Sequence, residues 1–393
     1  MYERKIYPDL LSHLAEKEVS VITGMRRVGK TTALRYLLDQ TPHDNKLYLD
    51  LERIEDRAIF TQNNFSEIQT DLEIKGIDFS QPAVIALDEV QLVPDAVSFI
   101  KYYHDHFSVK FIISGSSSYY LRNRITESLA GRKQIFDMYP LDFQEFLTFK
   151  EIDSSPLQAF RLKPYRQSLY AQYTAHYEEF IQYGGFPDVV LAGTADKKVR
   201  LLKDVLNSYI ELDVKLLSDY TAIDDLYRLV SLLASRIGSR LDYTKLASLI
   251  GISRHKVKDY LHLLERTYFL HLIKPYSANT DRAIAVQPKM YLADTGLISQ
   301  LAQVSSGALF ENAIALQLMR LGSLSYFQLK TGQEIDFILD RQTAIEVKET
   351  PTPSDSSVLV ARATSLGLQE TQLIGRYPPR SEFMDFIWGG MVG

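Results

Sequence analysis

Residues 18–32, EVSVITGMRRVGKTT, are the stretch that most restricts how this chain of 393 residues can fold. A β-rich run from Val19 to Thr23 leads into a glycine-bounded loop, and the helix pattern TALRYLLDQ follows at once. A strand, a loop and a helix in this order are the repeating unit of a parallel α/β fold, in which such loops lie at the carboxyl ends of the strands. The sequence therefore predicts an α/β domain at the amino terminus.

The same loop has the pattern of a phosphate-binding site. It matches G-x-x-x-x-G-K-[ST], in which glycines let backbone N–H groups turn toward phosphate oxygens at the start of a helix. Lys30 is expected to reach the β and γ phosphates of ATP, and the Thr31 hydroxyl is expected to bind Mg²⁺. An ordinary glycine turn is the alternative. The residues predicted to bind ATP in this loop are Gly24, Arg27, Val28, Gly29, Lys30, Thr31 and Thr32.

Residues 83–90, AVIALDEV, form a continuous apolar run that ends in two acids, as in a strand covered on both faces. The acids then lie at the carboxyl end of the strand, where α/β sheets bind their ligands. Asp88 is predicted to hold Mg²⁺, and Glu89 is predicted to act catalytically by polarising the attacking water. The plain alternative is an apolar strand with a solubilising acidic end.

A further strand pattern, residues 109–118, ends in hydroxyl side chains. Ser114 and Ser116 are predicted to contact the γ-phosphate or the attacking water, whereas serines that cap a turn are the alternative. Arg132 is a candidate to stabilise charge on the nucleotide of a neighbouring molecule, and a structural ion pair is its alternative. Two more arginines compete for that role, Arg122 and Arg124.

The composition limits the classes of protein to consider. A chain of 393 residues exceeds a comfortable single core, so we expect two or three domains. With 46% hydrophobic and 24% charged residues, no apolar run of about 18 residues and no signal-peptide pattern, the chain is expected to be cytoplasmic without a membrane partner. The absence of cysteine excludes disulfides, thiolate zinc sites and cysteine nucleophiles. A net charge of −5 restricts any nucleic-acid surface to a local patch.

Residues 242–272 have the spacing of a helix-turn-helix. Gly251 is the expected turn, and Ser253 is the expected cap of the second helix. A β-rich stretch with a turn follows and is predicted to form the wing of a winged helix. The apolar residues expected to form the core of this module are Leu246, Leu249, Ile250, Ile252, Val257, Tyr260, Leu261 and Leu264.

The same region is locally basic. Eight Lys or Arg residues face three acids between residues 236 and 274, a local charge of about +5. His255, Lys256 and Lys258 lie on the presumed recognition helix. Residues 236–274 are therefore predicted to contact DNA, and a packing module between domains is the alternative.

Residues 334–350, EIDFILDRQTAIEVKET, predict a hairpin with a three-residue connection. In this register the numbers of facing residues add to 682, so Asp336 faces Glu346 and Glu334 faces Lys348. Two carboxylates directly across a ladder repel each other. The pair therefore needs a compensating cation or a functional role.

The sequence resembles an AAA-type ATPase, and more closely a widespread prokaryotic ATPase family whose carboxyl-terminal part is a domain of unknown function. The resemblance spans most of the chain and implies phosphate-binding and metal-binding roles for Gly29, Lys30, Thr31, Asp88 and Glu89. It implies no particular physiological substrate. The motifs that carry it are GMRRVGKTT, ALDEVQ, IISGSSS, SLAGRK, YPLDFQEF, YGGFPDVV, PKMYLADTGL, FENAIALQL and EIDFIL–IEVK.

The carboxyl-terminal part resembles the restriction-endonuclease-like nuclease superfamily in its order of helix, strand, hairpin, helix and strand. The resemblance implies that Glu311, Asp336 and Glu346 bind Mg²⁺, and that Lys348 acts catalytically by orienting water or balancing charge. Seven basic residues against eleven acids from 294 to 393 argue against DNA cleavage. A plain ion pair between Glu334 and Lys348, in a non-catalytic interaction domain, is the alternative.

The sequence thus predicts three parts. Residues 1–150 form an AAA-type P-loop ATPase domain, residues 151–293 a helical region with a winged helix, and residues 294–393 an α/β restriction-endonuclease-like domain. The predicted function is ATP hydrolysis coupled to action on DNA through the winged helix and a Mg²⁺-dependent nuclease-like domain. The alternative is an ATP-gated switch that binds a protein or DNA partner and cuts nothing. A homo-oligomer is compatible with both.

Overall fold

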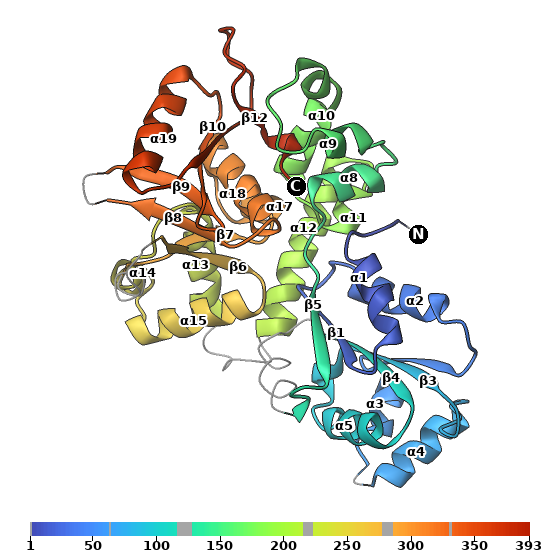
Figure 1. The fold of residues 1–393 in the computed structure, drawn as a ribbon. Helices are drawn as coiled ribbons and strands as arrows, with labels where there is room; N and C mark the ends of the chain where they lie inside the picture. Colours follow the sequence, from blue (N-terminus) through green and yellow to red (C-terminus); the bar gives the residue numbers. More distant parts are fainter. Residues whose placement is uncertain (1, 63, 116–127, 215–222, 277–285, 330–331) are drawn as a thin grey trace. The chain divides into compact units, whose positions relative to one another are not determined.

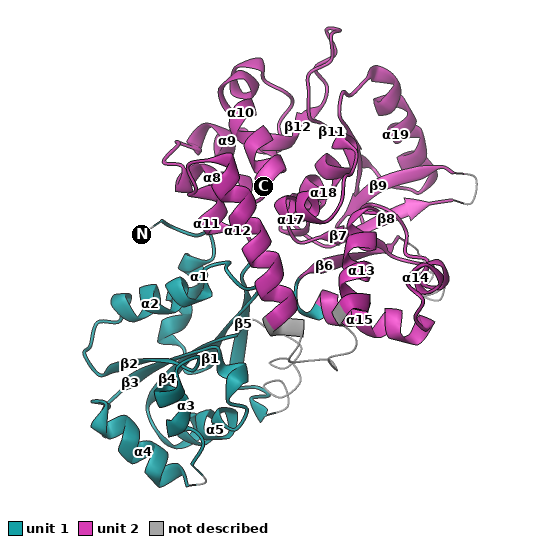
Figure 2. Ribbon diagram, turned by 180° about the vertical axis from the view of Figure 1, so that it is seen from behind, with its two compact units in different colours: residues 1–139, 266–268 teal, residues 140–265, 269–393 magenta. Residues whose placement is uncertain are grey.

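The structure is a computed structural model that describes residues 2–62, 64–115, 128–214, 223–276, 286–329 and 332–393 (Figure 1). The chain divides into two compact units, shown in teal and magenta in Figure 2. The first unit contains residues 1–139 and 266–268, and the second contains residues 140–265 and 269–393. The first unit corresponds to most of the predicted ATPase part. The second unit holds both the predicted middle part and the predicted carboxyl-terminal part.

The first unit is built on a parallel sheet, which in the described residues has five strands in the order β2-β3-β4-β1-β5. Strands β1, β3 and β4 are buried at every position, as their continuous apolar runs predict. This confirms the predicted α/β fold of the amino-terminal part. The strands are β1 (Val19–Thr23), β2 (Lys46–Asp50), β3 (Ala83–Asp88), β4 (Val109–Gly115) and β5 (Lys133–Asp137), and the helices are α1 (Tyr7–Ser12), α2 (Lys30–Gln40), α3 (Ile54–Ile59), α4 (Phe65–Ile74) and α5 (Ala96–His106).

Parallel strands bring their carboxyl ends to one edge of the sheet. In the first unit this edge collects the glycine loop after β1, Asp50 at the end of β2, Asp88 at the end of β3 and Gly115 at the end of β4. The core beneath the edge contains apolar side chains from all these strands and from α3, α4 and α5. The sheet topology therefore assembles the candidate nucleotide site from segments far apart in the sequence.

The second unit combines helices with a mixed sheet, which in the described part of the chain has seven strands in the order β12-β11-β10-β9-β8-β6-β7. Its strands are β6 (Leu270–Pro275), β7 (Lys289–Leu292), β8 (Leu324–Gln328), β9 (Glu334–Leu339), β10 (Thr343–Lys348), β11 (Glu370–Gly375) and β12 (Ile387–Trp388). Its helices are α8 (Phe143–Phe149), α9 (Ser155–Ala159), α10 (Gln167–Tyr183), α11 (Pro187–Val190), α12 (Ala195–Ser208), α13 (Ile223–Ala234), α14 (Tyr243–Ile250), α15 (Arg254–Arg266), α17 (Thr295–Leu301), α18 (Ser306–Met319) and α19 (Pro353–Ser365). Among the helices described, none is long and apolar enough to cross a membrane.

Helices α14 and α15 confirm the predicted helix-turn-helix spacing. Gly251 ends α14 in the left-handed conformation, and the Ser253 hydroxyl accepts a hydrogen bond from the Lys256 N–H at 3.1 Å. Six of the eight predicted core residues are buried, but Leu249 is 51% exposed and Ile252 is only half-buried. The prediction was wrong for Leu249. Helical spacing shows which residues lie on or beside the apolar face of a helix, but it does not show how much of that face the neighbouring elements bury.

Strands β6 and β7, which follow this module, pair antiparallel with each other. Strand β6 also pairs in parallel with β8, at Lys274↔Ser325 and Pro275↔Tyr326. The strands expected to form a separate wing thus belong to the large sheet of the second unit. The assignment of a winged helix stays a prediction.

The hairpin β9–β10 has the predicted register. The pairs Thr343↔Leu339, Ala344↔Ile338 and Ile345↔Phe337 each add to 682. Three residues, 340–342, connect the strands, and Asp340 and Arg341 adopt left-handed conformations with φ of 49° and 60°. Alternation along the two strands, with a three-residue connection, is enough to set this pairing.

Two motifs of the sequence meet at Asp294, where YGGFPDVV and PKMYLADTGL pack together. The Asp294 carboxylate caps α17 by accepting the Gly296 N–H at 2.9 Å, and it also accepts the Gly185 N–H at 2.7 Å. A Cβ atom on Gly184, which has a φ of +74°, would lie 1.9 Å from Asp294 Oδ1. Only glycine fits there. The glycines therefore serve packing around a buried carboxylate.

Candidate functional site

The glycine loop between β1 and α2 contains three residues with positive φ. Gly24, Arg27 and Gly29 have positive φ values of 152°, 63° and 102°. A Cβ atom on Gly24 would lie 2.0 Å from the Met138 carbonyl oxygen, so a larger residue cannot replace it without moving the backbone that directly follows β5. Alternating handedness turns successive N–H groups into one concavity, which suits an anion such as a phosphate. The loop geometry fits the predicted ATP cradle.

The side chain of Lys30 is buried inside this loop. Its ammonium donates hydrogen bonds to the carbonyl oxygens of Gly24 and Met25, at 3.0 and 2.9 Å. Arg4 holds the outer part of the loop by donating to the Val28 carbonyl at 2.9 Å. The lysine therefore lies at the loop that it is predicted to serve, with its charge held by loop carbonyls.

Asp88, at the end of β3, is almost fully buried, with 2% exposure. Two hydroxyls from neighbouring strands donate to its carboxylate, Tyr48 of β2 at 2.9 Å and Ser114 of β4. The Ser114 oxygen also accepts the Glu89 N–H at 3.2 Å. Ser114, predicted as a sensor, thus positions both acids. Such hydrogen bonds fix the orientation of a metal-binding carboxylate.

Tyr48 was not identified from the sequence. Burial and the neighbouring Asp88 raise the pKa of its hydroxyl, so it remains a hydrogen-bond donor at neutral pH. The guanidinium of Arg35, on α2, lies 5.0 Å from the centre of the tyrosine ring. The available signal was the run KLYLDLE, whose alternation places Tyr48 and Asp50 on one face of a strand next to β3.

Glu89 follows directly after β3 in a left-handed conformation with a φ of 55°. Such a conformation is unusual for a residue other than glycine and often occurs at functional sites. The Gln91 side-chain amide donates to Glu89 Oε2, and the Glu89 side chain is buried. The backbone thus presents Glu89 at the edge of the sheet beside Asp88.

The residues of the first unit fit Mg²⁺ bound together with a nucleotide. Asp88 supplies a hard carboxylate oxygen, and Thr31 supplies a hydroxyl at the exposed start of α2. Among the described residues, no group of three or more histidine, aspartate or glutamate side chains is arranged to hold a metal ion.

Arg132 lies at the opposite edge of the same sheet. Its carbonyl oxygen accepts the N–H of Val19, the first residue of β1, and its Nε donates to Asp105 at 2.7 Å. This pairing lowers the pKa of the Asp105 carboxyl, first through the hydrogen bond from Arg132. Arg132 therefore forms a structural ion pair, which was the alternative to its predicted contact with a neighbouring nucleotide. Contact with the nucleotide of another molecule stays a prediction, and Ser116, Arg122 and Arg124 lie outside the described residues.

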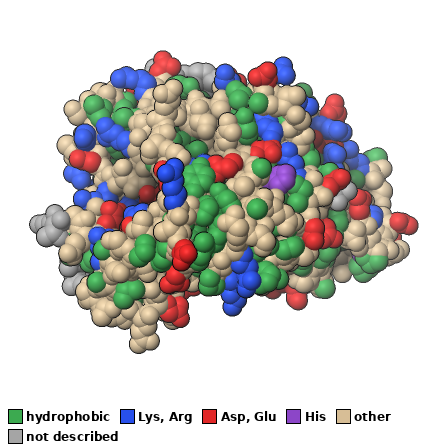
Figure 3. Space-filling view, turned by 90° about the horizontal axis from the view of Figure 1, so that it is seen from above, with side chains coloured by type: hydrophobic (Ala, Val, Ile, Leu, Met, Phe, Trp, Pro, Cys, Tyr) green, Lys and Arg blue, Asp and Glu red, His purple; other side chains and the backbone are tan. Residues whose placement is uncertain are grey.

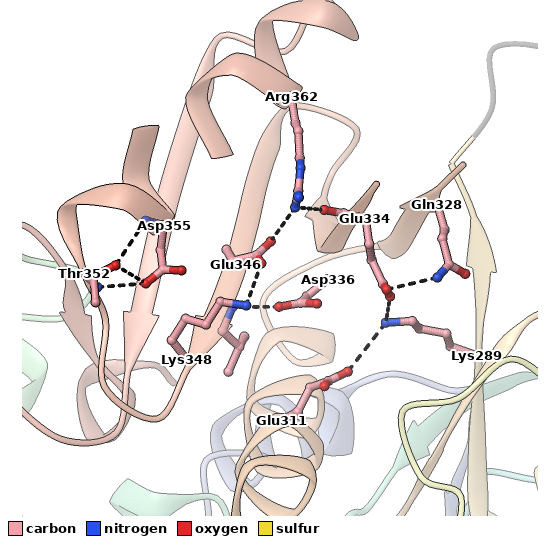
Figure 4. A network of polar contacts seen from close by, with 11 residues as sticks. Lys289, Glu311, Gln328, Glu334, Asp336, Glu346, Lys348, Thr352, Asp355 and Arg362 are labelled. Carbon is pink, nitrogen blue, oxygen red and sulfur yellow. Dashed lines mark hydrogen bonds and ion pairs between the residues drawn. The ribbon is translucent and has the colours of Figure 1, made fainter. Parts of the chain in front are cut away.

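The second unit brings the predicted nuclease-like residues into one cluster (Figure 4). Glu311 comes from α18, Asp336 from β9, and Glu346 and Lys348 from β10. The Lys348 ammonium donates to Glu346 at 2.7 Å, and Asp336 accepts the N–H of Val347 at 2.9 Å. The predicted cross-strand partner of Lys348, Glu334, is instead paired elsewhere.

Lys289 of β7 is the partner of Glu334, and the sequence did not identify it. Its ammonium forms an ion pair with Glu334 and lies 3.6 Å from Glu311 Oε1 (Figure 4). Tyr291, two residues further along β7, donates to the same Glu311 oxygen at 2.6 Å. The signal was the alternation in KMYL, which places Lys289 and Tyr291 on one face of the strand.

Burial dominates the electrostatics of this cluster. It raises the pKa of the carboxyls of Glu311 and Asp336, and with the repulsion from Asp336 it raises the pKa of Glu346 to about 6. Burial alone would lower the pKa of Lys289, but the carboxylates of Glu311, Asp336 and Glu334 outweigh it and raise that pKa.

The predicted Mg²⁺ site in this cluster fits by ligand type but not by arrangement. Glu311, Asp336 and Glu346 offer hard oxygens, and Glu346 Oε2 is buried without a hydrogen-bond partner in the described part of the chain. However, the carboxylates described do not converge as three or more ligands. Lys289 also lies between Glu311 and Glu334.

The basic helix α15 is partly neutralised by nearby acids. Lys256 pairs with Asp225 of α13 at 3.0 Å, and His255 pairs with Asp259 at 2.8 Å on the exposed face. The Lys258 ammonium lies 5.6 Å from the centre of the Tyr243 ring. On the face of the molecule in Figure 3, basic and acidic side chains of the described residues are likewise interspersed. Any DNA contact by α15 must therefore compete with these ion pairs.

Family models match three stretches of the chain. Residues 16–147 match a family described as AAA domain, and this stretch contains the glycine loop, Asp88 and Glu89. Residues 174–308 and 306–378 match two domains of unknown function, DUF8612 and DUF4143. The amino-terminal part is thus similar to an AAA domain, in agreement with the sequence resemblance.

Relatives with similar sequences extend over both units. The "Uncharacterized protein" of Haemophilus influenzae is 26% identical over 378 residues, which cover 91% of this chain and 90% of that protein. "Uncharacterized protein MJ1544" of Methanocaldococcus jannaschii is 27% identical over 343 residues, with coverages of 84% and 74%. Their names state no activity and assign none to this chain.

Two solved structures show low similarity to this chain. The Aeropyrum pernix ORC1 protein in complex with DNA has a TM-score of 0.32 and 13% identity, and the match covers 81% of this chain and 94% of that chain. The Thermotoga maritima RuvB protein has a TM-score of 0.33 and 14% identity, with coverages of 69% and 89%. Scores of this size carry no argument about partners or activity.

Proposed function

We propose that this protein binds and hydrolyses ATP with Mg²⁺ at the carboxyl edge of its parallel sheet. The observation that carries the proposal is the loop from Gly24 to Lys30, in which three residues have positive φ and which lies at the same edge of the sheet as Asp88 and Glu89. The match of residues 16–147 to the AAA domain family supports it.

Each residue has a distinct role in this proposal. The loop N–H groups and Lys30 hold the phosphates and balance their charge. Thr31 and Asp88 would hold Mg²⁺, which supplies charge neutralisation on the phosphate oxygens. Glu89 orients and polarises the attacking water, and Ser114 and Tyr48 keep Asp88 in place.

Two substitutions test the division between binding and hydrolysis. Lys30→Ala removes the charge within the loop and should abolish ATP binding in a calorimetric titration. Glu89→Gln keeps the side-chain volume but removes the carboxylate, so ATP should still bind while phosphate release falls by about a hundredfold or more. Glu67→Gln, on the exposed face of α4, is the matched control and should change neither. Normal phosphate release by Glu89→Gln would remove Glu89 from its catalytic role.

We propose that the basic region of residues 236–274 binds DNA by contacting its phosphates. Its support is the local charge of about +5 on a helix-turn-helix with the observed caps. A protein partner for an ATP-gated switch is the competing proposal, favoured by the ion pairs that neutralise part of α15. A homo-oligomer and a cytoplasmic location stay predictions.

Metal-dependent DNA cleavage by the second unit is a second candidate function. It is favoured by the buried Glu346 oxygen, which has no hydrogen-bond partner within the described residues, and by the neighbouring Lys348. The arrangement of the other acids does not favour it. Incubating the protein with supercoiled DNA and Mg²⁺ or Mn²⁺, with and without ATP, measures nicking directly. Nicking that Lys348→Ala abolishes would establish this function, and its absence would leave the unit as an interaction domain.

A further inference from the structure

Lys289 holds an unusual position for a lysine, because its side chain is only 5% exposed and is surrounded by acids. It forms an ion pair with Glu334 and lies 3.6 Å from Glu311 Oε1. Its backbone is fixed in β7, opposite Ile273 of β6. Its ammonium also lies 5.6 Å from the centre of the Tyr326 ring. The charge is therefore anchored in the cluster rather than reaching to solvent.

Each basic side chain of the cluster pairs with a different set of carboxylates. Lys348 and Arg362 lie 2.7 and 3.9 Å from the two oxygens of Glu346. Lys289 therefore pairs with Glu311 and Glu334, and Asp336 lies in the same cluster (Figure 4). A built-in ammonium thus compensates the charge of two partly buried carboxylates, those of Glu311 and Glu334.

The neighbours of the acids direct them toward Lys289. Tyr291 donates to Glu311 Oε1, the same oxygen that faces Lys289. The Gln328 side-chain amide donates to Glu334 Oε2 at 3.1 Å, which leaves Oε1 of that residue for the lysine. Glu311 and Glu334 are thus engaged in a pairing that does not require a metal ion.

We propose that Lys289 is the resident cation of this cluster and that it excludes a divalent cation from the carboxylates of Glu311, Glu334 and Asp336. An ammonium and a metal ion need the same oxygens, and two positive groups a few ångströms apart in a buried site repel strongly. Removing the lysine charge should therefore convert the cluster into a divalent-cation site of hard oxygen ligands. The inference concerns the second unit and does not depend on ATP hydrolysis by the first.

The test is a Mn²⁺ titration of the full chain, without ATP, in a Lys30→Ala background that disables the nucleotide site. We expect no saturable Mn²⁺ binding and no rise in melting temperature for this parent. Adding Lys289→Met should lower the melting temperature in the absence of metal, because it leaves buried carboxylates unpaired. Mn²⁺ should then restore it, with an apparent Kd at least about tenfold tighter than any binding by the parent. Lys274→Met, at an exposed position of β6, is the control and should behave like the parent.

The outcomes separate clearly. Saturable Mn²⁺ binding by the parent that Asp336→Asn abolishes would overturn the proposal. So would a folded Lys289→Met protein that binds no Mn²⁺. Should Lys289→Met fail to fold, Lys289→Met combined with Glu334→Gln removes one unpaired charge and keeps the carboxylates of Glu311 and Asp336 for the same titration. Phosphate release by the protein with Lys30 intact measures the ATPase proposal separately, so neither failure can be mistaken for the other.

Discussion

At the scale of single residues, the clearest result is that polar side chains from distant segments complete each candidate site. Asp88 depends on Tyr48, forty residues earlier, and Glu311 depends on Lys289. Asp294 shows the same principle without a catalytic role, since three backbone N–H groups, those of Gly185, Gly296 and Leu297, converge on its carboxylate. Burial outweighs these hydrogen bonds and raises the pKa of Asp294 to about 7.

Asp294 should therefore make the stability of the second unit depend on pH. A carboxyl with a raised folded-state pKa stabilises fully below its unfolded value of 3.8, and this contribution is lost as the pH rises to about 7. The unfolding free energy of the parent minus that of Asp294→Asn should thus fall by about 1.4 kcal/mol per pH unit between pH 5 and 7, and stay level above about pH 8. Urea unfolding of both proteins across this range measures the difference. A difference that is constant with pH would show that Asp294 is ionised throughout.

Tyr48→Phe should slow ATP hydrolysis and leave ATP binding nearly intact. The substitution removes the hydroxyl that donates to Asp88 and keeps the ring that packs near Arg35. Loss of such a supporting hydrogen bond costs roughly tenfold in metal affinity or activity. Phosphate release measured against Mg²⁺ concentration should show a raised Mg²⁺ requirement, whereas Tyr102→Phe, a partly exposed tyrosine of α5, should match the parent. An unchanged Mg²⁺ dependence would make Tyr48 a packing residue only.

At the scale of elements, α15 joins a buried face to a basic surface. Val257, Tyr260, Leu261 and Leu264 are buried, whereas Arg254, His255 and Lys258 are exposed. Capping at Ser253 sets where the helix begins, and this decides which side chains face solvent. The element can therefore present charge to a partner without losing its core.

Replacing Lys256 and Lys258 together with Ala should weaken binding to any DNA duplex and reduce the dependence of log K on log salt by up to about two phosphate contacts. The reduction should come mostly from Lys258, because Lys256 is already paired with Asp225. Fluorescence anisotropy at several salt concentrations measures both quantities, with Lys101→Ala on α5 of the first unit as the control. Unchanged affinity and salt slope would leave the helix-turn-helix as a packing module.

At the scale of the whole molecule, the compact units do not follow the chain order. Residues 266–268 belong to the first unit although the residues on either side belong to the second. Within the first unit the Tyr268 hydroxyl accepts a hydrogen bond from Thr23 at 3.1 Å and donates to Asp137 at 2.5 Å. Thr23 and Asp137 end the neighbouring strands β1 and β5, next to the glycine loop. A late segment of the chain thus completes the edge that holds the candidate nucleotide site.

Tyr268→Phe should therefore loosen the first unit at that edge. Loss of the hydroxyl leaves Thr23 and Asp137 without this partner, at a cost of about 1 kcal/mol or somewhat more. Hydrogen exchange of the full chain should show faster exchange in β1 and β5 and unchanged exchange in β9 and β10, which serve as the internal control. Exchange rates in β1 and β5 that match those of the parent would show that the hydroxyl contributes nothing to this edge.

The sequence by itself determined the features that depend on residues close together in the chain. The strand, glycine loop and helix of residues 18–40, the buried strand ending at Asp88, the turn at Gly251 and the 682 register of the hairpin all follow from local periodicity and special backbone conformations. Periodicity shows which face of an element is buried. It does not show which distant segment covers that face.

The tertiary structure decided everything that depends on the order of strands in a sheet. It placed Tyr48 and Ser114 on either side of Asp88, because β2 and β4 flank β3. It placed Arg132 at the edge away from the glycine loop, and it exposed Leu249 at the end of the predicted core. It also brought Lys289 among the acids of the second unit. A cation among buried carboxylates is required by electrostatics, but only the packing of β7 and α18 selects which residue supplies it.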